Sequence, residues 1–121
     1  MRKLIGAVSH HHREVEELRA DRRFAVEYLK AALESLDNPE ERGASLLMLR
    51  AVAEAYGGLA KVAAEAGISR ESLYRSLSPK GNPTFKTLTA IINAMGLRLS
   101  VVEKRQVKKK RARARVTRKA A

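Results

Sequence analysis

Four polar side chains in one short segment, Arg70, Glu71, Tyr74 and Arg75, have the types and the spacing to recognise another molecule together. On an α-helix, residues three and four positions apart lie on the same face, so the four side chains would project in one direction. Side chains of these types can donate and accept the hydrogen bonds that base edges offer in the major groove of DNA. We therefore interpret them as candidate DNA contacts.

The segment from Leu59 to Ser78 predicts the elements that would position these side chains. It has the layout of a DNA-binding helix-turn-helix, in which two short helices flank a turn. Gly67 can adopt the left-handed conformation that ends a helix, Ile68 is expected to pack between the helices, and Ser69 can cap the second helix. Apolar residues at helical spacing predict the inward face: Leu59, Val62, Ala63, Ala66, Leu73 and Leu77.

Two helices around a glycine also form helical hairpins in proteins that never touch DNA, so a protein-interaction module is an alternative interpretation. Three features favour DNA binding: the small Ala63 where the helices would cross, the capped second helix without an exposed leucine, and the basic composition. The chain has 25 Lys or Arg and 13 Asp or Glu among 121 residues, which gives a formal net charge of +12.

Two amphipathic helices are predicted before this hairpin. The first follows Asp21, which is placed as its N-cap, and its apolar residues recur at helical spacing up to Asp37. The second begins at Asn38-Pro39 and extends to about Tyr56, because a capping residue followed by proline is typical of a helix start. Residues 1–20 show no clear apolar stripe, so we treat them as an N-terminal extension with at most a helical turn or two.

After the hairpin, residues 79–83 have the composition of a loop, and Thr84 is placed to cap a last helix that Gly96 closes. The predicted fold is therefore all-α, a bundle of about five helices in one domain over residues 21–102, with residues 59–78 as its helix-turn-helix core.

Residues 97–101 change period, because the apolar Leu97, Leu99 and Val101 alternate with polar residues as in a β-strand. A single strand leaves its backbone groups unpaired, so we expect it to pair with the same strand of a second copy. The resulting two-fold homodimer would bind a palindromic operator in double-stranded DNA. The alternative is an irregular segment packed on the helices.

Residues 103–121 form a strongly basic tail with ten cations and one acidic residue. A segment with so many like charges cannot bury an apolar face, and we therefore expect it to be disordered. We expect it to neutralise DNA phosphates without sequence preference. A solubilising tail is the alternative. The cations are Lys104, Arg105, Lys108, Lys109, Lys110, Arg111, Arg113, Arg115, Arg118 and Lys119.

Composition argues against several other classes of protein. The chain has no cysteine, which excludes disulfides and is compatible with a bacterial cytoplasm, and no segment approaches the length of a membrane span. No set of residues fits an enzyme or a cofactor site. Neighbouring residues on a helix point in different directions, so we interpret His10, His11 and His12 as exposed and expect no metal site.

Three motifs give the chain a resemblance to a known family: Gly58-Leu59-Ala60-Lys61, the run from Gly67 to Arg75, and Gly81-Asn82-Pro83-Thr84-Phe85. Over roughly residues 21–102 the chain resembles the probable addiction-module antidote family, small helix-turn-helix proteins related to HigA-type antitoxins and lambda-repressor-like domains. The resemblance implies a five-helix bundle that represses its own operon and neutralises a RelE-like toxin.

The resemblance also implies roles for single residues. Base contacts would be made by Arg70, Glu71 and Tyr74. Phosphate contacts would be made by Ser69, Arg75, Lys80, Asn82, Thr84 and Lys86. Because a cationic tail would repel a basic toxin, a stand-alone repressor or a nucleoid-associated DNA-binding protein is the alternative function.

Overall fold

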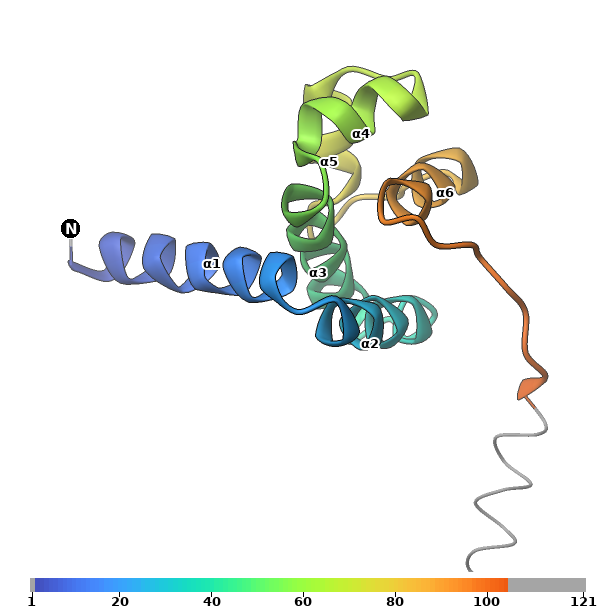
Figure 1. The fold of residues 1–121 in the computed structure, drawn as a ribbon, viewed down its shortest axis with the longest axis horizontal. Helices are drawn as coiled ribbons and strands as arrows, with labels where there is room; N and C mark the ends of the chain where they lie inside the picture. The colour runs from blue at the N-terminus through green and yellow to red at the C-terminus, as the bar shows by residue number, and fades with distance from the viewer. Residues whose placement is uncertain (1, 105–121) are drawn as a thin grey trace, which may run out of the picture.

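The computed structural model describes residues 2–104, with side chains from His10 onward, and contains six helices and no strand in that range (Figure 1). The predicted all-α class is confirmed, with one helix more than expected. The helices are α1 (Arg2–Ala20), α2 (Arg22–Glu34), α3 (Arg42–Ala55), α4 (Gly58–Ala66), α5 (Arg70–Ser76) and α6 (Phe85–Ala94).

Helix α3 lies at the centre of the bundle and contacts α1, α2, α4 and α6. Its sequence allows this because small and branched apolar residues occupy nearly every side of the helix, which suits an element buried on several faces. In Figure 1, α2 and α4 lie at opposite ends of α3. The buried residues of α3 are Ser45, Leu46, Leu49, Ala51, Val52, Ala53 and Ala55.

Helix α1 is a continuous element of 19 residues, so the expectation of a helical turn or two was wrong. Val15 and Leu18, three residues apart, are buried against the bundle, and α1 contacts α2 and α3. Tyr56 supports this contact, because its hydroxyl donates a hydrogen bond of 2.6 Å to the carbonyl oxygen of Leu18. The second half of α1 is therefore stabilised by tertiary packing.

The boundary between α2 and α3 also differs from the prediction. Asp21 caps α2 as expected, accepting a hydrogen bond of 3.1 Å from the backbone N–H of Phe24, but the helix ends at Glu34. Asn38 does not begin α3. Instead its side chain accepts from the N–H of Glu40 at 3.0 Å, closing a turn that precedes the first helical residue, Arg42.

The predicted strand at residues 97–101 is not present, because the chain after α6 continues without regular structure to residue 103. Leu97 is half-buried and packs against the core, whereas Leu99 is exposed and Val101 is 93% exposed. Alternation of apolar and polar residues predicts a strand only where a neighbouring strand can satisfy the backbone. The chain offers no such partner in its described part, so pairing through this segment has no structural support.

The loop between α5 and α6 is packed closely against the end of α5. A Cβ atom at Gly81 would lie 2.1 Å from the carbonyl oxygen of Ser76, so no other residue fits there without a backbone shift. The N–H of Gly81 donates a hydrogen bond of 2.8 Å to the carbonyl oxygen of Ser78. This packing fixes the position of the residues that follow, up to the start of α6.

Candidate nucleic-acid interface

The turn between α4 and α5 has the local geometry that the sequence predicts. Gly67 adopts the left-handed conformation, with φ 70° and ψ 31°, and ends α4. Ile68 follows with a backbone hydrogen bond of 3.0 Å to the carbonyl oxygen of Ala63. Ser69 caps α5, because its Oγ accepts from the N–H of Ser72 at 3.0 Å. The predicted end of one helix and the predicted cap of the next are both confirmed.

Helix α5 has one buried and one exposed side. The predicted inward residues Leu73 and Leu77 are fully buried. The polar residues on the other side are all exposed and line one open hollow of about 470 Å³: Arg70, Glu71, Tyr74 and Arg75. None of these four forms an ion pair with the side chains described, those of residues 10–104, so the charges of Arg70, Glu71 and Arg75 are available to a ligand.

Tyr74 is held in place by Arg50, a residue of α3 that sequence reasoning did not single out. The guanidinium carbon of Arg50 lies 3.9 Å from the centre of the Tyr74 ring, which is a cation–π contact. The Nη2 atom also donates hydrogen bonds to the Tyr74 carbonyl oxygen at 3.3 Å and to the Ser78 Oγ at 3.2 Å. Tyr74 is still 51% exposed to solvent.

The predicted phosphate contacts fall into two groups. Three have polar partners within the chain: Ser69 and Thr84 cap α5 and α6, and the Asn82 Oδ1 accepts from the Arg42 Nη2 at 2.9 Å. Arg75, Lys80 and Lys86 are exposed cations. The Lys86 ammonium lies over the turn that ends α4, 3.1 Å from where a Cβ of Gly67 would be. The structure therefore brings Lys86 close to the start of α5.

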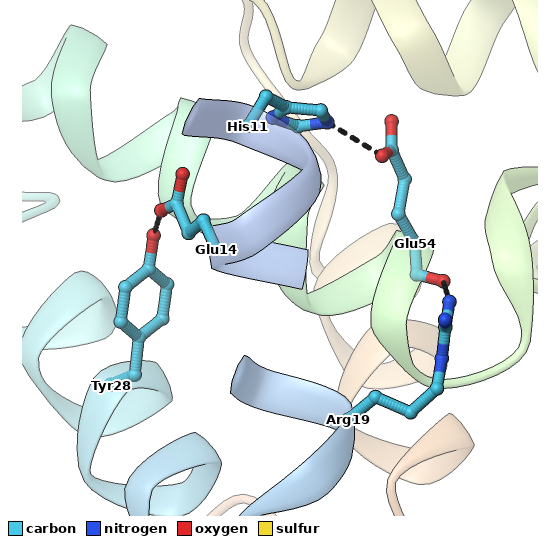
Figure 2. Close-up of polar contacts among 5 residues, drawn as sticks. All are labelled: His11, Glu14, Arg19, Tyr28 and Glu54. Atoms are coloured by element: carbon cyan, nitrogen blue, oxygen red, sulfur yellow. Dashed lines mark hydrogen bonds and ion pairs between the residues drawn. The ribbon is translucent and has the colours of Figure 1, made fainter. Parts of the chain in front are cut away.

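A groove beside α5 is lined by residues of α1, the end of α3 and the start of α4, and Arg70 borders it. Figure 2 shows two of its polar contacts: the His11 Nε2 lies 2.7 Å from the Glu54 Oε2, and Arg19 donates to the Glu54 carbonyl oxygen. The Arg19 Nε also donates to the carbonyl oxygen of Ala55 at 3.3 Å. The Tyr28 hydroxyl donates to the Glu14 carboxylate on the far side of α1.

The histidine triplet was predicted to be exposed throughout, and this is wrong for one residue. His10 and His12 are exposed, but His11 is partly buried and contacts Glu54 across 43 residues of sequence. Helical periodicity could not find this contact, because the partner comes from a distant helix. No group of three or more potential metal ligands occurs among the described residues.

The basic tail lies almost wholly outside the residues that the structure describes. Lys104 is within them and is exposed, whereas the cations from Arg105 to Lys119 are not described. In residues 2–104, no helix combines the length and the apolar character needed to cross a membrane.

Comparison with known proteins places the chain in a family. Residues 10–103 match the family described as "Probable addiction module antidote protein". A segment of 47 residues is 45% identical to an uncharacterized protein of Haemophilus influenzae (strain ATCC 51907 / DSM 11121 / KW20 / Rd). That match covers 39% of this chain and 48% of the relative, so the chain spans about half the length of this curated protein. No solved structure matches the chain. Because the family match extends from α1 past the end of α6, the chain belongs to the family of probable addiction module antidote proteins.

Proposed function

We propose that the chain is an antitoxin that binds double-stranded DNA sequence-specifically, represses its own operon as a homodimer on a palindromic operator, and neutralises a RelE-like toxin. Membership of the family implies a toxin partner of some kind. The observation that supports DNA binding is the exposed side of α5, where Arg70, Glu71 and Tyr74 project from a capped helix. In this proposal α5 is the recognition helix and those three residues contact base edges.

The surroundings of α5 suit the phosphate backbone. Arg75, Lys80 and Lys86 are exposed cations beside or after the recognition helix, and Ser69 and Thr84 lie at the N-termini of α5 and α6. Helix N-termini and cations together favour an anion such as a phosphate. A dimer would place two such surfaces on half-sites about 10 base pairs, or a multiple of that, apart.

The toxin would bind at the other end of the molecule. Helix α2 lies at the end of α3 away from α4, so a protein bound there leaves α5 free (Figure 1). Glu27 and Glu34 lie two helical turns apart on α2 and are exposed, and Glu27 is only loosely paired with Lys30 at 3.5 Å. These acids are complementary to the basic surface expected of a RelE-like toxin.

A stand-alone repressor or nucleoid-associated protein is the second candidate function. The basic tail favours it, because ten cations in 19 residues would bind any duplex through its phosphates and would repel a basic toxin. The two functions differ in whether a toxin is bound, and they share the DNA-binding surface.

The first prediction tests base contact by Arg70. Replacing Arg70 with Ala should cost about 1–3 kcal/mol on the DNA upstream of the chain's own gene and leave binding to a random duplex little changed. The measurement is fluorescence anisotropy with both duplexes. Arg23→Ala, which removes the same charge from α2, is the matched control and should have no effect on the preference. Equal losses on both duplexes would show that Arg70 contacts only phosphate.

The second prediction concerns the tail. Deleting residues 104–121 should weaken binding to all duplexes alike and flatten the dependence of log K on log salt, because each neutralised phosphate contributes about −0.9 to that slope. Titrations at several salt concentrations measure the slope. An unchanged slope would show that the tail makes no phosphate contacts.

The third prediction concerns the toxin. The double charge reversal Glu27→Lys and Glu34→Lys should lower affinity for the neighbouring gene product roughly 10- to 100-fold, since like charges would then face each other. Co-purification and calorimetry measure this, and Glu65→Lys on α4 is the matched control. A tail deletion should leave the complex intact. A neighbour that neither inhibits growth nor co-purifies would favour the stand-alone regulator.

A further inference from the structure

We propose that Arg50 is a positioning residue for the recognition helix: it fixes the ring of Tyr74 in the orientation in which Tyr74 contacts its base. The inference rests on the proposed DNA binding and adds a residue that would not itself touch DNA. Arg50 belongs to α3, the central helix, and its side chain contacts Tyr74 of α5.

The contacts of Arg50 hold both the ring and the backbone of Tyr74. The guanidinium stacks on the ring at 3.9 Å, while the Nη2 donates to the Tyr74 carbonyl oxygen and to the Ser78 Oγ. Ser78 completes the cluster, because its Oγ donates to the same carbonyl oxygen at 2.9 Å. A planar guanidinium can lie flat on the ring while the N–H groups at its edge donate, a geometry that the compact lysine ammonium does not reproduce. The end of α5 and the Tyr74 ring are therefore fixed by one side chain.

The positive charge of Arg50 has few polar partners, fewer than a residue that stabilises the fold would need. No carboxylate forms an ion pair with Arg50 within the described range, and its Nε is buried without a hydrogen-bond partner there. A partly buried cation without an anionic partner contributes little to stability, and an apolar side chain of similar length often serves as well. What an apolar side chain cannot supply is the pair of hydrogen bonds and the stack on Tyr74. The pattern of contacts thus points to orientation of Tyr74 rather than to stability.

Fixing the ring in advance should increase specific affinity. An exposed tyrosine on a helix samples several side-chain conformations, and binding must select one of them. A ring already held in the binding conformation avoids that entropy cost when it contacts DNA. The gain applies only to duplexes on which Tyr74 makes a base contact, so it should raise the preference for the specific site.

The fourth prediction tests this with Arg50→Lys, which keeps the charge but loses the planar stack. We expect about 10-fold weaker binding to the DNA upstream of the chain's own gene and unchanged binding to a random duplex. Combining it with Tyr74→Ala should add no further loss of specific affinity, because Arg50 acts through Tyr74.

The stability of the fold is tested separately with Arg50→Met, which should unfold at the same temperature as the wild type or higher. Arg22→Met is the control, since Arg22 faces the ring of Tyr56 at 5.8 Å, outside the recognition helix.

The binding measurements separate the positioning role of Arg50 from the proposed DNA binding itself. Full specific affinity in Arg50→Lys, together with a loss in Tyr74→Ala, would overturn the positioning role and leave the proposed function intact. Additive losses in the double variant would show that Arg50 acts independently of Tyr74 and would also overturn it. A wild-type chain that binds both duplexes equally would instead overturn the proposed function, and this inference with it.

Discussion

The burial of α3 on several sides is the constraint on which the rest of the structure depends. Four other helices pack against it, and its small and branched apolar residues allow this close approach. Because α4 and α6 pack on α3 and α5 packs on α4, the direction of α5 is set through this central helix. Arg50 adds a direct polar contact from α3 to α5. The surface proposed to bind DNA is therefore positioned by the same residues that form the core.

The central position of α3 also separates two surfaces. Helices α4 and α5 lie at one end of α3, and α2 lies at the other (Figure 1). If the exposed side of α5 binds DNA and Glu27 and Glu34 of α2 contact a toxin, both partners can be present at once. The groove lined by α1 is bordered by Arg70 of α5, and the contact between His11 and Glu54 in it joins α1 to the end of α3. The fold is compatible with repression and toxin binding by the same molecule.

Local features of the fold could be predicted from the sequence, because they depend on neighbouring residues. Asp21, Ser69 and Thr84 cap their helices, and Gly67 ends α4 in the left-handed conformation. The exposed side of α5 was also predicted, since the spacing of Leu73 and Leu77 defines the buried side. Whether those exposed residues contact DNA stays a prediction.

Features that depend on distant contacts could not be predicted. The second half of α1 packs against the bundle through Val15 and Leu18, and the strand was predicted from an alternation that has no backbone partner in the described residues. The role of Arg50 could not be predicted from the sequence, because its contact with Tyr74 joins residues 24 apart in the chain. Periodicity reports the faces of single helices, whereas these features require the arrangement of several.

In the proposed function, the exposed side of α5 recognises a specific DNA sequence. DNase I footprinting of the wild-type chain on the DNA upstream of its own gene tests this most directly. Sequence-specific recognition predicts protection of a discrete, palindromic site at protein concentrations that leave the flanking DNA open. Uniform protection along the fragment, or none, would contradict sequence-specific recognition.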